Sequence, residues 1–428
     1  MSQLLIQPLP SPSAFPAALG HLLVGPRHME RRFARHGEVV PDWAPGPGRI
    51  VWLRDPQHIA HVLRSPGVET SAMGRCIGRA VGASTLLLQL NGEQHRAVRR
   101  VFAASVRGQA LGRCRNSIAV AAREMAASCP DGVPFPLLPL LDRAVLQANI
   151  ASCVSIDDPG ELRVWSDAVQ RVRRKAANPL AASHAVGFPL PYPPARWARQ
   201  KLSGLIRGEI ARRHRAGVPG DDTLGQMLAS KEEIMTQDVV IDQVTLYLIG
   251  GQSASLAAAW AVERALRHPD AWAKVSAEGA SQDGNPTPYT DAVINEALRL
   301  RPPIPTTPFY LHQPCDVGGY RVPAGTWVVL SIWGLHHRPD LHSDPETFRP
   351  ERFLEDPPAR GTWLPFGTGP HGCVATQLAL VQARELMHTL ARRGSLEPAS
   401  RRDEQVKHRS GSEIYPGQGC RVILHTRP

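Results

Sequence analysis

A single cysteine surrounded by glycines is the feature that most constrains this chain. The stretch from Trp363 to Ala375 reads WLPFGTGPHGCVA, and a helix-like run from Gln377 to Arg392 follows at once. Glycines allow a loop to turn tightly and to press its backbone against a flat ligand. A cysteine at a helix N-terminus lies where the helix dipole favours thiolate over thiol. The pattern predicts either a thiolate that can ligate a haem iron or, as the alternative, a buried cysteine in a glycine-rich turn.

Four residues of this stretch follow the spacing F-x-x-G-x-H-x-C, namely Phe366, Gly369, His371 and Cys373. This spacing resembles the haem-binding loop of the cytochrome P450 superfamily, and the chain resembles its soluble, bacterial-type members. The resemblance implies a haem b cofactor whose iron is ligated by Cys373. It also implies haem contacts from the rest of the loop: Phe366, Gly367, His371 and Ala375. Ala375 is a departure, because the family usually has glycine there.

Composition indicates a globular protein without a membrane anchor. The chain has 428 residues, of which 43% are hydrophobic and 20% charged, and no apolar run reaches the roughly 18 to 20 residues that span a bilayer. Four prolines interrupt the apolar N-terminus, which also lacks the order of a signal peptide. The seven cysteines form no C-x-x-C pair, which argues against a disulfide framework or a zinc-thiolate site. We expect a cytoplasmic monomer with a proline-rich lead-in over 1–27 and one domain over 28–428.

The formal charge of +11 at first suggests nucleic-acid binding. However, the basic residues are mostly single arginines without interleaved aromatic residues or a known reader motif. A basic docking face for an acidic protein partner explains the charge better. By the resemblance, that partner is a ferredoxin or flavodoxin-type electron donor fed by NAD(P)H, since the chain has no flavin domain or ferredoxin-type cysteine cluster. Five arginines are candidates for this face: Arg96, Arg100, Arg107, Arg113 and Arg115.

A second motif lies in the predicted helix over 92–102. His95 and Arg99 are four residues apart and therefore lie on one helix face. Two donors at this spacing can bind a carboxylate, and the pair resembles the His-x-x-x-Arg of the family, which holds the haem propionates. The alternative is an ordinary solvated basic face.

A long apolar helix is predicted from Val239 to Arg267, with Thr236 or Asp238 as its cap. Gly250 and Gly251 interrupt it, at a cost of roughly 1 kcal/mol each relative to alanine, so we expect something to lie close to the backbone there. The position resembles the family's distal-groove motif, in which an acid and an alcohol organise water for oxygen activation.

In this chain the acid and alcohol positions hold Ser253 and Ala254, and Ser255 follows one position late. Ser255 should face elsewhere, because successive helical residues differ in direction by about 100°. Three hypotheses remain open. Protons come from a substrate hydroxyl or a bound water, or the enzyme uses peroxide or an activated substrate, or the protein binds haem and catalyses little. Gly251, Ser253, Ala254 and Ser255 join Cys373 as candidate catalytic positions.

A third motif combines Glu296 and Arg299, which face each other at i and i+3, with Arg352 in a downstream Pro-Glu-Arg-Phe segment. Glu-x-x-Arg alone is uninformative. Its order before the Pro-Glu-Arg-Phe segment and the cysteine loop resembles the structural ion triad of the family, which we expect to be buried and architectural.

Several regions are expected to line a substrate pocket. Residues 66–84 show no clear period and are predicted to be a loop, and the proline-rich stretch 178–194 resembles a lid whose alternative is a surface linker. The candidate pocket residues are Met73, Ile77, Tyr247, Gly250, Ile304, Thr306 and Thr307. The family commonly has a propionate-binding arginine near 309–310, where this chain has Phe309 and Tyr310, so His312 is a candidate substitute.

The fold expected from the resemblance is mainly α-helical with small β-sheets, a triangular haem-thiolate domain covering about residues 28–426. The expected function is that of a monooxygenase oxidising a medium-sized organic substrate in secondary-metabolite biosynthesis. The alternatives are a haem-thiolate enzyme that does not activate O2, with peroxygenase, nitrene-type, rearrangement or coupling chemistry, and a non-catalytic haem protein.

Overall fold

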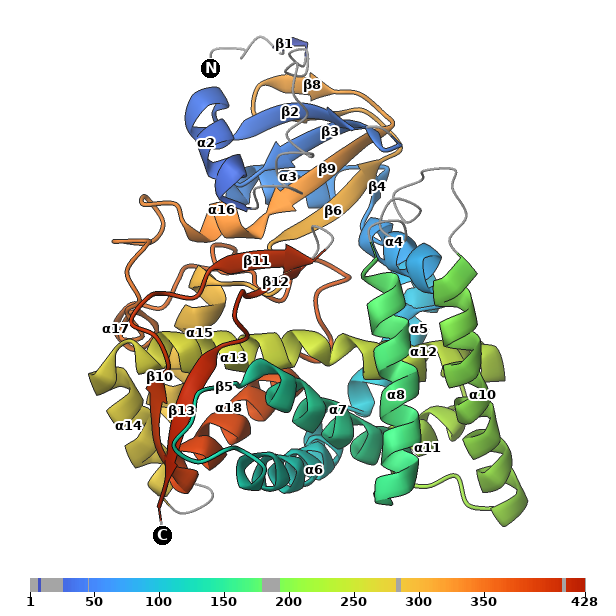
Figure 1. The fold of residues 1–428 in the computed structure, drawn as a ribbon. Coiled ribbons are helices and arrows are strands. Elements are labelled where there is room, and N and C mark those ends of the chain that lie inside the picture. Colours follow the sequence, from blue (N-terminus) through green and yellow to red (C-terminus); the bar gives the residue numbers. More distant parts are fainter. Residues whose placement is uncertain are drawn as a thin grey trace.

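In the computed structural model, a β-rich part lies beside a larger helical part (Figure 1). The structure describes residues 7–8, 26–44, 46–178, 193–281, 286–409 and 413–427. Most of the predicted lead-in over 1–27 and almost all of the predicted lid over 178–194 lie outside these residues. The architecture is mainly α-helical with small β-sheets, as the sequence predicts.

The β-rich part is built on a five-stranded sheet with the order β2-β3-β9-β6-β4. Its strands are β2 (Val39–Ala44), β3 (Gly48–Leu53), β9 (Thr326–Ser331), β6 (Thr306–Leu311) and β4 (Val68–Glu69). β3 pairs with β9 in parallel, and the other neighbouring pairs are antiparallel. Helices α2 (Pro26–His36), α3 (Pro56–Arg64) and α16 (Ile332–His336) lie beside this sheet (Figure 1).

Three smaller sheets complete the β structure. They have the orders β1-β8-β7, β10-β13-β5 and β11-β12. Their strands are β1 (Gln7–Pro8), β8 (Tyr320–Val322), β7 (Cys315–Val317), β10 (Gly394–Pro398), β13 (Arg421–Thr426), β5 (Phe135–Pro136), β11 (Val406–Arg409) and β12 (Glu413–Pro416). Residues 318–326 cover the turn between β7 and β8, strand β8 and the approach to β9.

The helical part surrounds a pair of consecutive helices, α12 (Gln237–Gly250) and α13 (Gln252–Leu266), which cross the molecule (Figure 1). Against them pack α7 (Leu138–Val154), α15 (Pro288–Leu300) and α18 (Thr376–Arg393). The remaining helical elements are α5 (Gly92–Ala104), α6 (Gly108–Ala127), α8 (Pro159–Ala176), α10 (Pro193–Ala216), α11 (Thr223–Leu228), α14 (Pro269–Ala280), α17 (Arg352–Glu355) and a 3-10 turn, η1 (Leu87–Gln89). The interior is apolar, and α13 contributes almost all of its residues to it.

The predicted continuous helix over 239–267 is interrupted, which corrects the sequence interpretation. α12 ends at Gly250, Gly251 is the residue between the two helices, and α13 begins at Gln252. Thr236 caps α12 by accepting from the Val239 N–H, as expected. A Cβ atom on Gly251 would lie 2.2 Å from the side-chain nitrogen of Asn149 on α7. Glycine is required here because another helix side chain approaches the backbone, a contact that periodicity cannot reveal.

The predicted loop over 66–84 is also wrong in part, because it contains helix α4 (Ala72–Val81) and strand β4. Gly82 ends the helix in the left-handed conformation, with φ of 72°. Gly74 and Gly78, which suggested a loop, are contact positions. A Cβ atom on Gly74 would lie 1.9 Å from the carbonyl oxygen of Leu88. The glycines therefore allow α4 to pack closely on the chain around η1.

Candidate functional site

The cysteine loop turns back on itself and presents Cys373 just before α18. The Cys373 N–H donates to the carbonyl oxygen of Phe366 at 2.8 Å, and the Gly372 N–H donates to Gly369 at 3.1 Å. Gly367 and Gly369 have φ values of 71° and 73°, which favour glycine strongly over other residues. The loop therefore owes its shape to these glycines, and its cysteine is one of the free cysteines, with an exposed side chain.

The protonation of Cys373 depends on two opposing effects. Its surroundings desolvate the sulfur although the side chain retains accessible surface, and this desolvation raises the pKa of the thiol above its ordinary value. The Ala375 N–H, the Thr376 side chain and the Arg99 charge lower the pKa but do not outweigh desolvation. The sequence predicted that the helix N-terminus would favour the thiolate. In the structure, desolvation favours the thiol instead, and a cation bound to the sulfur would reverse this effect.

Helix α15 holds the start of the cysteine loop in place. The indole N–H of Trp363 donates to the carbonyl oxygen of Asn295 at 3.2 Å. The Leu364 N–H donates to Nε2 of His336 at 2.8 Å, and Nδ1 of His336 lies 3.1 Å from the Arg299 carbonyl oxygen. His336 is fully buried, and burial lowers its pKa well below the ordinary value. The neutral ring therefore accepts from the loop on one side and donates to α15 on the other.

The structure brings the three residues of the predicted ion triad together. Arg299 donates twice to Glu296, at 2.8 and 2.9 Å, and both side chains are fully buried. Arg352 lies 3.2 Å from the same carboxylate and is 4% exposed. Arg299 also donates to three backbone carbonyls, those of His336, Pro345 and Thr347. The cluster thus joins α15 to α16, to the segment around 345–347 and to α17.

His95 and Arg99, predicted as propionate ligands, both reach the cysteine loop from α5. Arg99 donates to the carbonyl oxygen of Gly372 at 2.9 Å. The ring of His95 packs against that of His371 with 4.3 Å between centroids. His95 is 4% exposed, and its Nε2 has no hydrogen-bond partner among the described residues. A buried ring nitrogen without a partner is costly unless a ligand satisfies it, so the donor set fits a haem carboxylate.

His371, which we predicted to contact the haem, makes two contacts within the protein. Its Nδ1 lies 2.9 Å from the Thr70 hydroxyl, and its Nε2 lies 2.9 Å from the Leu90 carbonyl oxygen. The carbonyl accepts, so Nε2 carries the proton and Nδ1 accepts from Thr70. His371 therefore ties the cysteine loop to the segments that flank α4, and these contacts engage both of its ring nitrogens.

The break between α12 and α13 separates the candidate catalytic positions. Outside its own helix backbone and chain neighbours, no atom of the described residues would lie within 4 Å of a Cβ built on Gly250, whereas a Cβ on Gly251 would meet Asn149. Ser253 is half-buried, Ala254 is 5% exposed and Ser255 is fully buried. The Ser255 hydroxyl lies near two acceptors, the Gln252 carbonyl oxygen at 2.8 Å and Asp142 on α7 at 3.2 Å. Ser255 faces α7, as the helical period predicts.

A polar cluster at this break escaped the sequence analysis. Arg173 on α8 donates to the carbonyl oxygens of Leu248 and Ile249 at 2.6 and 3.1 Å, and to Asp142 at 3.1 Å. These carbonyls lie in the last turn of α12, where the intrahelical partners run out. Asp142 also accepts from Gln170 at 3.2 Å. No sequence signal marks these residues, because they come from two separate helices whose local pattern is ordinary.

Tyr247, predicted to line the substrate pocket, makes its contacts inside the protein core. Its hydroxyl lies 3.1 Å from the Ser152 hydroxyl and 3.5 Å from the Cys114 sulfur, and the residue is 6% exposed in the core formed with α6 and α7. Of the other pocket candidates, Gly250 at the end of α12 is exposed. The remaining five are half-buried and lie on α4 (Met73, Ile77), before β6 (Ile304) and on β6 (Thr306, Thr307).

The segment 309–312, where the family's arginine is missing, is also occupied by internal contacts. Phe309 is buried, and Tyr310 packs edge-on against Trp327. His312 is exposed and lies 3.0 Å from a Glu69 carboxylate oxygen, so it is already engaged by the strand next to it.

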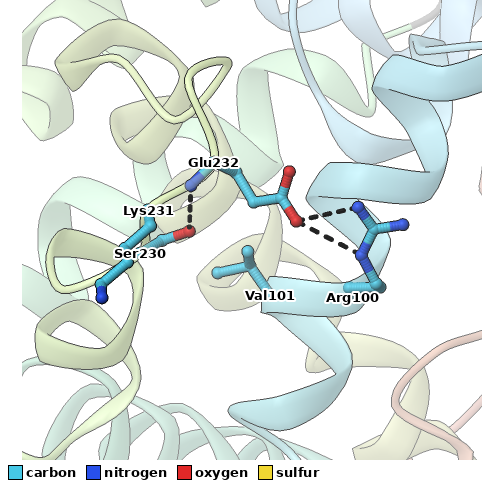
Figure 2. Close-up of a pocket in the computed structure, with 5 residues that line it drawn as sticks. All are labelled: Arg100, Val101, Ser230, Lys231 and Glu232. Atoms are coloured by element: carbon cyan, nitrogen blue, oxygen red, sulfur yellow. Dashed lines mark hydrogen bonds and ion pairs between the residues drawn. The ribbon is translucent and has the colours of Figure 1, made fainter.

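The predicted basic face is partly neutralised by local ion pairs. Arg100 donates to Glu232 at 2.8 Å beside a shallow surface pocket lined also by Val101, Ser230 and Lys231 (Figure 2). Arg96 pairs with Glu93 at 2.6 Å, and Arg113 lies 3.7 Å from Asp221. Arg107 and Arg115 are exposed. The face therefore carries less free positive charge than the sequence count suggests.

No helix among the described residues combines the length and apolar character that crossing a membrane requires.

Comparison with known proteins agrees with this geometry. The cytochrome P450 family model matches residues 9–416. A Mycobacterium bovis protein named "Putative cytochrome P450 135B1" is 30% identical over 404 residues, covering 91% of this chain and 84% of that protein. Cyclooctat-9-en-7-ol 5-monooxygenase of Streptomyces melanosporofaciens is 28% identical, covering 85% and 83%. The crystal structure of a cytochrome P450DA mutant haem domain aligns with a TM-score of 0.84 at 20% identity, covering 98% of both chains. The chain is a member of the cytochrome P450 family.

Proposed function

We propose that this protein is a haem-thiolate monooxygenase that oxidises a medium-sized organic substrate in secondary-metabolite biosynthesis, in the cytoplasm. The observation that carries the proposal is the free, exposed Cys373 on a glycine loop, with Arg99 and the unpartnered Nε2 of His95 beside it. The substrate class is supported by the Streptomyces relative, whose name describes oxidation of a cyclooctatenol.

Each residue of the site has a separate task in this proposal. The Cys373 sulfur would hold the haem iron, and His95 and Arg99 would hold haem carboxylates. Phe366, Gly367 and Ala375 would form the loop surface against the porphyrin. When bound, a thiolate-ligated haem supplies oxygen activation and oxidation of an unactivated C–H bond. Glu296, Arg299 and Arg352 would fix the position of the loop, since their cluster holds the segments packed against it.

Electrons would come from NAD(P)H through a separate acidic ferredoxin or flavodoxin-type protein. Arg107 and Arg115 are exposed arginines on the chain near α5 and α6, and Arg107 lies near enough to Arg99 for the two charges to interact. An acidic partner docking here would approach the side of the molecule that carries the cysteine loop.

A second candidate function is favoured by the break between α12 and α13. Ala254 has no hydroxyl group, Ser253 has no charge, and the Ser255 hydroxyl lies near Asp142. Proton delivery from this segment to a bound oxygen molecule is therefore weakened. An enzyme that takes its oxygen from peroxide, or that works on an already activated substrate, does not need this delivery.

Spectroscopy and turnover test the two functions. The haem-loaded protein, reduced under carbon monoxide, should show the absorbance band of thiolate-ligated haem. Cys373→Ala should abolish that band, whereas Cys76→Ala, which removes another free thiol, should keep it. A compound screen for displacement of the iron-bound water would identify ligands. Their turnover with ferredoxin, reductase and NADPH, compared with peroxide alone, separates the two functions. A nitrogen-ligated spectrum in the unmodified protein would overturn both.

A further inference from the structure

A cluster of two carboxylates and one imidazole lies on the β-rich part of the molecule, apart from the cysteine loop. Glu30 belongs to α2, His337 follows α16, and Glu346 lies in the segment before α17. One ligand atom of each residue lies within 4.8 Å of those of the other two. These residues are far apart in the sequence, so the fold alone brings them together.

His337 supplies the observation that distinguishes this cluster from a group of surface acids. Its side chain is 2% exposed, and Nδ1 lies 2.9 Å from the Trp333 carbonyl oxygen, to which it donates. Nε2 therefore carries the lone pair. Nε2 is buried, has no hydrogen-bond partner among the described residues, and lies 3.9 Å from a carboxylate oxygen of Glu346. Burial lowers the pKa of His337 to about 3, so the ring is neutral at physiological pH, the form that binds metals.

Trp333 orients both inner ligands. Its indole ring stacks on His337 with 4.4 Å between centroids and 12° between planes. Its indole N–H donates to Oε1 of Glu30, which leaves Oε2 of that carboxylate for another partner. Outer contacts that fix ligand orientation in this way are typical of protein metal sites.

We propose that Glu30, His337 and Glu346 bind one divalent transition-metal cation, with Zn²⁺ as the best match to the ligand set. Imidazole nitrogen and carboxylate oxygen are both ligands of Zn²⁺, and water can fill the remaining position. Ligand atoms about 2.0 to 2.2 Å from a tetrahedral Zn²⁺ lie about 3.4 Å apart. The distance from His337 Nε2 to the Glu346 carboxylate oxygen is 3.9 Å, and rotation of the exposed Glu346 side chain would shorten it on metal binding.

The local charge acts on the cluster in both directions. Burial raises the pKa of Glu30, and the nearby Glu346 charge raises it further, so a divalent cation between the carboxylates would relieve their repulsion. Arg299, Arg301 and Arg27 act in the opposite direction, since their charges reach His337, and the charges of Arg27 and Arg54 reach Glu30. The guanidinium of Arg301 lies 5.2 Å from the centre of the Trp333 ring, on which it packs. The carboxylates of Glu30 and Glu346 offset part of this positive charge, and Arg299 is itself paired with Glu296.

The consequence of such a site is structural. Glu346 lies between Pro345 and Thr347, whose carbonyl oxygens accept from Arg299. A cation at this site would connect α2 to the segment that the buried Glu296–Arg299–Arg352 cluster also holds. It would thereby stabilise the N-terminal helix against the part of the chain that supports the cysteine loop.

The test uses the haem-loaded full chain, so that Cys373 is occupied. After treatment with EDTA and its removal, Zn²⁺ is titrated by calorimetry, and the bound metal is counted by mass spectrometry. We expect one Zn²⁺ per chain and a rise in Tm. Glu346→Gln, at a side chain that is 63% exposed, should fold normally and weaken Zn²⁺ binding at least about tenfold, since even outer-shell changes cost that much. Glu30→Gln should do the same.

Glu355→Gln is the matched control, because this exposed glutamate lies outside the cluster, and it should bind Zn²⁺ as the unmodified chain does. The proposal is overturned if the unmodified chain takes up no stoichiometric Zn²⁺. It is also overturned if Glu346→Gln binds Zn²⁺ as tightly as the control, which would place the metal elsewhere, or if Mg²⁺ binds more tightly than Zn²⁺. Should Glu30→Gln fail to fold, Glu346→Gln alone decides the matter.

Discussion

The hydroxyl group of Ser255 on α13 lies 3.2 Å from a carboxylate oxygen of Asp142 on α7. The hydroxyl therefore faces a neighbouring helix, and it also lies 2.8 Å from the Gln252 carbonyl oxygen. Ala254, one position earlier, has no hydroxyl group and cannot donate. In the proposed function, proton delivery is therefore the step that this segment would support least.

Ala254→Thr should restore a hydroxyl at the required position. We expect product formed per NADPH consumed, with ferredoxin and reductase, to rise on the order of tenfold or more, because a positioned proton donor contributes at least that much. Peroxide-driven turnover should change little. Ser255→Ala should leave both reactions nearly unchanged. If Ala254→Thr did not alter the ratio of product to NADPH, the missing hydroxyl would not be what limits oxygen use.

Arg173 should be important for stability because it satisfies the last carbonyls of α12 and pairs with Asp142. Arg173→Met leaves these acceptors without that donor inside the fold, and we expect a loss of about 2 to 4 kcal/mol in the free energy of unfolding. Its exposed neighbour Arg174 is the control, and Arg174→Met should cost less than about 0.5 kcal/mol. Urea unfolding measures both, and equal losses would contradict the role assigned to Arg173.

Arg352→Met should destabilise the protein by removing a buried contact to the Glu296 carboxylate. Glu296 is fully buried and Arg352 is 4% exposed, and because Arg299 still pairs with this carboxylate, we expect the loss of one hydrogen bond to a charged group, about 1.5 to 3 kcal/mol. Arg96→Met breaks the exposed pair with Glu93, in which the side chains are 64% and 72% exposed, and should cost below about 1 kcal/mol. Similar losses in unfolding free energy for the two variants would show that the buried cluster stabilises the fold no more than an exposed ion pair does.

His95→Leu should accelerate haem loss, because it removes the ring nitrogen that lacks a protein partner. One hydrogen bond of about 1 kcal/mol corresponds to a change of about fivefold. Transfer of haem to excess apomyoglobin gives the rate. His36→Leu is the control, since His36 is exposed at the end of α2, and it should release haem at the rate of the unmodified chain. Unchanged release from His95→Leu would remove His95 from the haem site.

Stability should fall in acid partly because of His342. Burial, assisted by the Arg299 charge, lowers its pKa to about 4 from the usual 6.5. Below pH 6.5 the His342 ring is protonated in the unfolded chain but stays neutral in the folded chain. The contribution of His342 to the free energy of unfolding is therefore at its maximum above pH 6.5 and declines as the pH falls to about 4. At about 1.4 kcal/mol per pH unit, the decline from this residue reaches at most about 3 kcal/mol.

His342→Gln tests this pH dependence, because glutamine does not titrate and its amide can replace the donation to the Thr362 carbonyl oxygen. Unfolding free energies of the holoprotein between pH 7 and pH 4 should show a shallower slope in this variant. His61→Gln, at an exposed site, should keep the original slope. An unchanged slope in His342→Gln would mean that His342 does not titrate on unfolding.

The motifs that sequence reasoning identified are those whose residues lie close together along the chain. Glu296 and Arg299 are one helical turn apart, as are His95 and Arg99, and Cys373 follows its glycines directly. In each case, the local spacing already places the side chains near one another. The errors have a different origin. Gly74 and Gly78 suggested a loop, although a packed helix needs small residues wherever another backbone approaches closely.

The sequence by itself determined the family pattern, the helical class and the glycine spacing of the cysteine loop, because these depend on neighbouring residues and on residue type. Only the tertiary structure decided which way the Cys373 pKa shifts, that Gly251 faces Asn149, and that Glu30 and Glu346 meet His337. The physical reason is that burial and contact between distant segments set desolvation and partner choice. Neither quantity is encoded in the spacing of residues along the chain.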